Sequence, residues 1–236
     1  MYHVNHVIAW IAVFAVGMIT SAGLAQHQHG DEAPSIPGEG VPPVMCPVMG
    51  EPANLALSVA TEDGPVFFCC KDCMPKFKAE PQKYTEGVAE QRRALAGRPK
   101  IQVTCPVSGE PVDTKVAIDH EGAKVHFCCK DCIDKFKAAP DKYKVALANG
   151  FTYQTRCPVT DETIDPKAFT TLANGAKVYF CCKGCEKKLF ADAAKYAPKL
   201  AAQGVNFDPK ALSQAPSKEP PAHDHEGHDH KPGHDH

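Results

Sequence analysis

The best guide to the architecture is the stretch Val125-His126-Phe127-Cys128-Cys129-Lys130-Asp131-Cys132-Ile133-Asp134-Lys135-Phe136, because the same pattern occurs three times along the chain. The first copy begins at Val66 and the third at Val178. A Cys-Pro-Val triplet precedes each copy, and its cysteine lies 23, 23 and 24 residues before the first cysteine of the pair. All 12 cysteines fall in this pattern, which predicts three small cysteine modules in tandem.

The predicted modules occupy residues 45–85, 104–148 and 156–200, and residues 86–103 are expected to form a helical linker. At about 40 residues a module has a hydrophobic core that is only marginal on its own, and a metal ion or disulfide bonds are usually needed as well. The net charge is −2 and the lysines are spread over all the modules. Neither feature predicts binding to nucleic acid.

The two ends of the chain have a different character. Residues 1–25 indicate a signal peptide, with an apolar run from Val7 to Ile19 and small residues before a cleavage point after Ala25. The alternative is a retained membrane anchor, but the run is shorter than the ~20 residues that a span needs. Residues 26–44 are expected to be a disordered leader rich in proline and glycine, and residues 201–236 a disordered, histidine-rich tail. The protein is therefore expected to be periplasmic or secreted, with no membrane span after signal removal.

The middle module predicts a small α+β fold. Residues 116–120 and 123–127 are short β-type runs separated by Glu121-Gly122, which is typical of a hairpin. Asp131 is expected to cap a following helix, and Pro140 to begin a second helix that runs to Ala148. Each module is thus predicted to be a loop, a β-hairpin and a helix, followed by a helical spacer.

This arrangement brings cysteines together. Cys105 lies on the loop, Cys128 at the end of a strand and Cys132 in the first turn of a helix, whose N-terminal partial charge favours thiolate. Cys129 would point to the opposite side of the strand, so it reaches the same ion only if the strand has already turned. The predicted metal ligands are all the cysteines: Cys46, Cys69, Cys70, Cys73, Cys105, Cys128, Cys129, Cys132, Cys157, Cys181, Cys182 and Cys185.

Three chemical states are considered for these thiols. Zinc bound by four cysteines would be structural, whereas three accessible thiolates would suit Cu(I) or another soft heavy metal. Disulfide bonding without metal is the third, because exported cysteines tend to oxidise. Thiol redox catalysis is a distant alternative, since the Cys-x-x-Cys at the helix start lacks a βαβ context. No catalytic triad, phosphate loop or carboxylate pair is evident, so the protein is not expected to be an enzyme.

Histidines provide a second, weaker set of ligands. His120 and His126 occur in one module only, so a surface or packing role is expected for both. The tail places imidazoles two residues apart, which allows weak metal capture by the neutral form, although a solvated tail is the alternative. The tail histidines are His223, His225, His228, His230, His234 and His236.

The repeated pattern consists, in order, of Cys-Pro-Val-x-Gly, a hairpin, Phe-Cys-Cys-x-x-Cys-x-x-Lys-Phe and Pro-x-Lys-Tyr. This pattern resembles the YHS domain and the related TRASH domain. The resemblance covers residues 45–85, 104–144 and 156–197, and Asp161 stands in the third copy where the others have glycine. It implies treble-clef or zinc-ribbon-like modules with a part in heavy-metal sensing, trafficking or resistance. YHS modules also occur beside copper transporters, so a transporter or another exported protein is an expected partner.

The sequence therefore predicts an exported, non-enzymatic protein that binds zinc, copper or another soft metal through three cysteine modules. The alternative is a structural zinc or disulfide module that contacts another protein.

Overall fold

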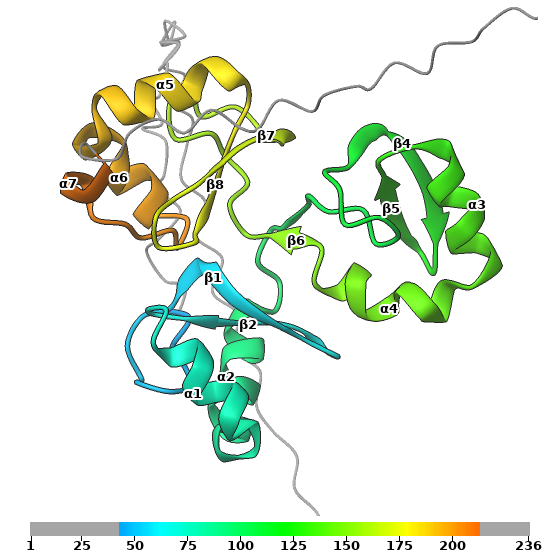
Figure 1. The fold of residues 1–236 in the computed structure, drawn as a ribbon, viewed down its shortest axis with the longest axis horizontal. Helices are drawn as coiled ribbons and strands as arrows, with labels where there is room; N and C mark the ends of the chain where they lie inside the picture. Colours follow the sequence, from blue (N-terminus) through cyan, green and yellow to red (C-terminus); the bar gives the residue numbers. More distant parts are fainter. Residues whose placement is uncertain (1–42, 213–236) are drawn as a thin grey trace, which may run out of the picture. The chain divides into compact units, whose positions relative to one another are not determined.

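The computed structural model describes residues 43–212, so the predicted signal peptide, nearly all of the leader and the histidine-rich end of the tail lie outside the described residues. Within this range the chain is a small mixed α/β protein in which a loop, an antiparallel hairpin and a helix occur three times (Figure 1). None of the helices described is long and apolar enough to cross a membrane.

The first module consists of a hairpin and the helices that follow it. Its elements are β1 (Asn54–Thr61), β2 (Gly64–Phe68), α1 (Cys73–Ala79), the 3-10 helix η1 (Pro81–Tyr84) and α2 (Thr85–Leu95). Phe68 and Phe77 pack with ring centroids 5.3 Å apart, which joins the end of the hairpin to α1. Burial of such a side chain stabilises the fold by about 2 kcal/mol.

The second module has the same core with an additional short sheet. Its elements are β3 (Ile101–Gln102), β4 (Asp113–His120), β5 (Ala123–Phe127), α3 (Lys130–Ala138), α4 (Pro140–Ala148) and β6 (Phe151–Thr152). Here β3 pairs with β6, and the strands β4 and β5 form the hairpin. Phe127 and Phe136 occupy the places of Phe68 and Phe77, with centroids 5.3 Å apart.

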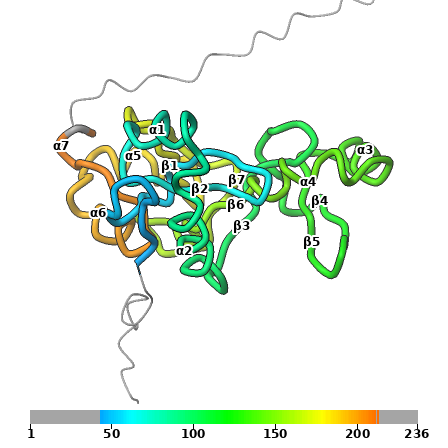
Figure 2. Tube along the Cα trace, turned by 90° about the horizontal axis from the view of Figure 1, so that it is seen from below, coloured from blue at the N-terminus to red at the C-terminus, as the bar shows by residue number. Residues whose placement is uncertain are grey.

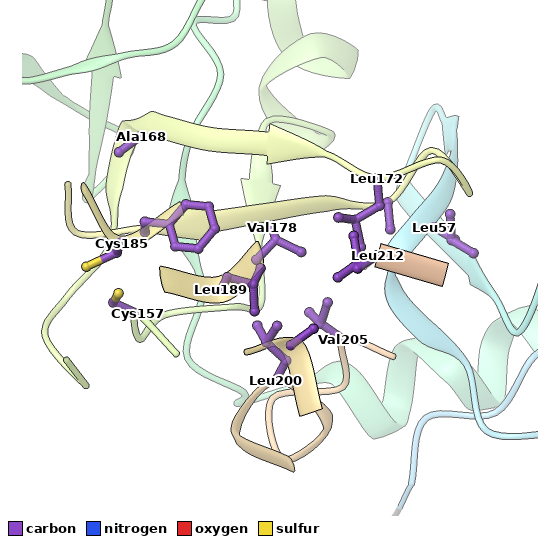
Figure 3. Packing of buried hydrophobic residues seen from close by; sticks show 13 residues of the cluster. Leu57, Cys157, Ala168, Leu172, Val178, Cys185, Leu189, Leu200, Val205 and Leu212 are labelled. Carbon is purple, nitrogen blue, oxygen red and sulfur yellow. The ribbon is translucent and has the colours of Figure 1, made fainter. Parts of the chain in front are cut away.

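The third module ends in three helices. Its elements are β7 (Asp165–Thr171), β8 (Lys177–Phe180), α5 (Lys183–Ala191), α6 (Ala193–Ala201) and α7 (Pro209–Leu212), and their order along the chain can be followed in Figure 2. Figure 3 shows that the sulfur atoms of Cys157 and Cys185 lie at one end of its core, while Leu172 and Leu212 lie at the other.

The predicted hairpins are confirmed, and they explain why the cysteine spacing differs by one residue in the third copy. In the second module Glu121 (φ 49°) and Gly122 (φ 79°) form the two-residue turn between the strands. In the third module five residues, 172–176, connect β7 and β8. The additional residue is accommodated inside the hairpin, so it does not displace the cysteines.

Two predictions about helix and chain ends were wrong. Asp131 does not cap α3: the N-cap is Cys129, whose backbone is still extended (φ −154°, ψ 170°) because strand geometry continues past β5. Residues 201–212 are not a disordered tail, since Val205 and Leu212 are buried in the core of the third module.

The predicted helical linker, residues 86–103, is helical only as far as Leu95, and Ile101–Gln102 form the strand β3. The helix is also more than a connection between modules. Val88 and Leu95 of α2 are buried in the core cluster of the first module. Gly87 lies so close to Pro47 that an added Cβ would come within 3.0 Å of the proline ring. The helix α2 is therefore an integral layer over the loop that carries Cys46.

Specific contacts connect the modules to one another. The backbone N–H of Leu55 donates to the carbonyl of Gly204 at 2.7 Å, and Leu57 belongs to the core cluster of the third module. Asn149 Nδ2 donates to the carbonyl of Thr61 at 2.7 Å. The modules therefore pack against each other through both backbone and apolar groups.

Candidate metal centres

Each module brings three cysteine sulfurs together, as the sequence predicts. Within each group the sulfur atoms all lie within 4.8 Å of one another, and the groups are Cys46, Cys69 and Cys73; Cys105, Cys128 and Cys132; and Cys157, Cys181 and Cys185. The loop cysteine and the helix cysteine are buried in every group, while the cysteine at the end of the strand is partly exposed. Three thiols at this spacing can bind one soft or borderline metal ion.

The loop that carries the first cysteine has the same backbone in all three modules. Cys105 N–H donates to the carbonyl of Glu110 at 2.7 Å, and Gly109 N–H donates back to the carbonyl of Cys105 at 2.9 Å. Equivalent pairs join Cys46 to Glu51 and Cys157 to Glu162.

The left-handed residue that closes this loop also recurs. It is Gly50 (φ 69°), Gly109 (φ 79°) and Asp161 (φ 63°). Aspartate tolerates this conformation better than most residues with a side chain. The third loop therefore keeps its shape without the glycine.

A buried glutamine fixes each loop to the strand that bears the next cysteine. Gln154 Oε1 accepts from the N–H of Tyr179 at 2.9 Å, and its Nε2 donates to the carbonyl of Tyr179 at 2.7 Å and to that of Arg156 at 3.2 Å. Gln102 makes the same set of bonds to His126 and Thr104. One amide thus joins the residue before the first cysteine to the strand residue two positions before the second.

In the first module the glutamine comes from a different part of the chain. Pro43 stands three residues before Cys46, and Gln91 of α2 supplies the amide instead. Gln91 Oε1 accepts from Phe67 N–H at 2.8 Å, and Nε2 donates to the carbonyls of Phe67 and Met45 at 2.8 and 2.7 Å. Sequence reasoning missed these glutamines, although Gln-x-x-Cys-Pro-Val at 102 and 154 was a repeated signal for two of them.

The second cysteine of each vicinal pair lies outside the group of three but close to it. Cys70, Cys129 and Cys182 are exposed, and their sulfurs lie 3.5, 3.7 and 3.6 Å from the helix cysteine of the same module. Sulfurs bound to zinc at ~2.3 Å in a tetrahedron lie ~3.8 Å apart. The exposed thiol is therefore near enough to be a fourth ligand or to receive the ion from the other three.

The loop cysteines of the second and third modules have clearly lowered pKa values. Burial alone would raise the pKa of Cys105, but the Ser108 hydroxyl and the backbone N–H groups of Cys128, Ser108 and Val107 lower it to about 7. Burial is likewise outweighed at Cys157, where backbone N–H groups of Cys181, Thr160 and Val159 bring the pKa to about 7. Each of these two loops thus preforms a nest of donors around one thiolate.

The helix cysteines have the opposite tendency. Burial, together with the neighbouring sulfurs, raises the pKa of Cys132 to about 12, and the pKa values of Cys73 and Cys185 are raised for the same reasons. A metal cation replaces those protons, because it compensates the negative charge that accumulates when several thiolates share one site. Metal binding should therefore release protons and weaken as the pH falls.

A hydroxyl group accompanies the strand cysteine in two of the modules. Ser108 Oγ lies 3.2 Å from Cys128 Sγ, and Thr160 Oγ1 lies 3.2 Å from Cys181 Sγ. The first module has Met49 at this position of the loop. The three centres therefore share a backbone and a thiol set but differ in the side chain at their edge.

Histidine plays no part in the clusters found among residues 43–212, which contain cysteine alone. The ring of His120 packs edge-on against Phe136 with centroids 5.0 Å apart. His126 lies on β5 outside the thiol group, and its buried Nδ1 has no hydrogen-bond partner in the described part of the chain. The tail histidines named above lie outside the described residues.

Comparisons with protein-family models, with characterised proteins and with solved structures find no match to this chain.

Proposed function

We propose that this protein is an exported metal-binding protein that carries or sequesters soft or borderline metal ions, with one ion at each cysteine module. The observation that supports this most strongly is the threefold convergence of three thiols within 4.8 Å, each group beside a fourth, exposed thiol. A site open on one side allows an ion to be passed on by ligand exchange, which a fully enclosed site would prevent.

The core of each module supports an exchangeable ion rather than a purely structural one. Phe68, Phe127 and Phe180 are fully buried beside the thiols, and each packs within an apolar cluster. Apolar contacts and the buried glutamine therefore hold the ligand-bearing segments together. The fold should persist after the ion is removed.

A structural zinc centre is the second candidate, because four sulfurs are available in each module. Cys70 Sγ lies 3.9 Å from Cys69 Sγ and 3.5 Å from Cys73 Sγ, close to the ~3.8 Å edge of a zinc–sulfur tetrahedron. In this case all four cysteines of a module would bind zinc, and chelation would unfold it. The module would then serve as a rigid surface for contact with another protein.

The proposal extends to family, location and partner. The repeated Cys-Pro-Val and Phe-Cys-Cys-x-x-Cys segments support membership of the TRASH or YHS group and a treble-clef-like arrangement of loop, hairpin and helix. The apolar run from Val7 to Ile19 supports export to the periplasm or beyond. The histidine tail would add weak secondary sites, and a metal transporter is the proposed partner.

The deciding experiment measures bound metal and free thiols on the full chain purified without added metal. The expected result is about one ion per module that a chelator removes while the circular dichroism spectrum is retained. A triple variant, C73S with C132S and C185S, provides the blank for metal held by the tail. Six disulfides and no metal would contradict the proposal, whereas unfolding on chelation would favour the structural zinc centre.

A further inference from the structure

The first module differs from the other two in the chemistry beside its thiols. Among residues 43–212 the large apolar side chains exposed to solvent are Met45 (39%), Met49 (57%) and Val145 (44%). The two methionines flank Cys46 in the sequence, one directly before it and one three residues after it. Exposed thioethers beside a thiol centre are therefore peculiar to this module.

The common loop backbone gives Met49 the position that Ser108 and Thr160 occupy in the other two modules. Cys46 N–H donates to the carbonyl of Glu51 at 2.7 Å and Gly50 N–H donates to that of Cys46 at 2.9 Å, the same two distances as in the second module. The side chain at this position of the loop, Ser108 or Thr160, lies 3.2 Å from the strand cysteine in the other modules. The side chain of Met49 therefore starts from the place where a hydroxyl contacts sulfur in the other two copies.

The exchange of a hydroxyl for a thioether changes which ions the centre favours. A hydroxyl donates to a thiolate, whereas a thioether is a soft ligand with no proton to donate. Thioether sulfur selects Cu(I), whereas zinc centres in proteins use thiolate, imidazole and carboxylate. Methionine also has three rotatable bonds, so the exposed side chain can turn its sulfur toward an ion held by the thiols.

We propose that Met49 is an additional ligand of the first module and makes this centre selective for soft monovalent ions such as Cu(I). This inference rests on the proposed metal-binding function and deepens it by distinguishing the three centres. Met45, next to Cys46, extends the thioether surface on the same loop. Met74 packs against the core of the module and is not part of the site.

Methyl NMR on the full chain with ¹³C-methyl methionine tests the ligand directly. Ag(I) is the probe for the soft monovalent ion, because it does not change its oxidation state during the titration, and Zn(II) is the comparison. The expected result is a large shift of the Met49 methyl resonance with the first equivalents of Ag(I) and little shift with Zn(II). The Met49→Leu variant assigns the resonance.

A matched pair of substitutions tests selectivity. Met49→Ser gives the first module the side chain of the second and should weaken Ag(I) binding there by about tenfold, with Zn(II) binding unchanged. Ser108→Met makes the reverse change and should strengthen Ag(I) binding at the second centre. Both positions are at the edge of the loop and Met49 is exposed, so both variants are expected to fold.

The outcomes separate the two proposals. Binding of Ag(I) by the thiols with no movement of the Met49 resonance, and equal Ag(I) affinity in Met49→Ser, would overturn the role of Met49 and leave the proposed function standing. Absence of thiol-dependent binding of both Ag(I) and Zn(II) would overturn both. A shift of the Met49 resonance that disappears in Cys73→Ser would support the complete site.

Discussion

The first and second modules reach the same thiol geometry by different routes. In the second, Gln102 precedes Cys105 by three residues and is held in the short strand β3. In the first, Gln91 approaches from α2, which follows the hairpin and α1 in the chain. The spacing of the cysteines is therefore encoded within each module. The glutamine that connects the cysteine-bearing segments can come from a different element in each module.

The largest expected effect comes from removing a helix cysteine in one module at a time. Cys73→Ser and Cys132→Ser should each abolish binding at their own centre and lower the metal content by one equivalent. Each helix sulfur lies 3.5–3.7 Å from both sulfurs of its vicinal pair, so the substitution removes a central ligand of the site. Native mass spectrometry counts the ions. Loss of more than one ion from either variant would mean that the centres are coupled rather than equivalent.

The next effect concerns the glutamines. Gln91→Ala leaves the N–H and C=O of Phe67 and the C=O of Met45 without their partner. A buried unsatisfied group costs about 1–3 kcal/mol, so the expected loss of unfolding free energy is about 3 kcal/mol. Gln102→Ala should cost the second module a similar amount.

Urea denaturation of the metal-free variants provides the measurement for this pair. The matched control is Gln82→Ala, because Gln82 is exposed on η1 and its side chain should contribute within ~0.5 kcal/mol. A wild-type unfolding curve for Gln91→Ala would show that the Gln91 amide does not stabilise the first module.

A smaller effect is expected from the hydroxyl that distinguishes the second module. Burial raises the pKa of Cys105 and the Ser108 hydroxyl lowers it, so Ser108→Ala should move this pKa upward from about 7 toward 9.0. The lowered pKa stabilises the folded metal-free protein above pH 9.0, and this contribution is lost as the pH falls through about 7. The variant should therefore gain less stability than the wild type between these pH values.

The shift in the pKa of Cys105 can be measured by titrating the metal-free protein with base and recording the absorbance of the thiolate. Thr160→Val in the third module provides the parallel case, because the Thr160 hydroxyl lies beside Cys181 as Ser108 lies beside Cys128. An unchanged titration curve in both variants would show that the loop N–H groups alone set the pKa.

The smallest effect concerns the contact between the second and third modules. Lys167 Nζ lies 2.9 Å from Asp113 Oδ2, and this hydrogen bond lowers the pKa of the aspartate. Both groups are accessible to solvent, so water and salt compete with the pair. Lys167→Ala should leave the denaturation midpoint unchanged at physiological salt. A clear drop, or a loss of metal from the second centre, would show that the modules depend on this contact.

Much of the fold and the thiol set was predictable because both depend on local patterns. The spacing from Cys105 to Cys128 to Cys132, with Gly122 between two β-type runs, was sufficient to predict the loop, the hairpin and the helix. The N-cap was mispredicted because Asp131 is a good capping residue, yet the extended backbone of β5 continues to Cys129.

The parts that escaped prediction depend on contacts distant in the chain. Gln91 resembles any polar residue of an ordinary helix, and only its approach to Phe67 and Met45 gives it a role. Val205 and Leu212 lie in a segment without periodicity, but the apolar surface of the third module buries them. A local sequence pattern predicts neither the burial of these side chains nor hydrogen bonds between residues far apart in the chain.

The position of Gln91 also sets an order of events while the chain is being made. A protein emerges from its N-terminus, so Gln102 and Gln154 are already present when Cys105 and Cys157 appear. Gln91 follows Cys46 by 45 residues and Cys73 by 18. All four thiols of the first module are therefore synthesised before the glutamine whose side chain connects their segments. During that interval the four thiols of the first module lack the amide that connects their segments, whereas Gln102 and Gln154 precede the thiols of their own modules.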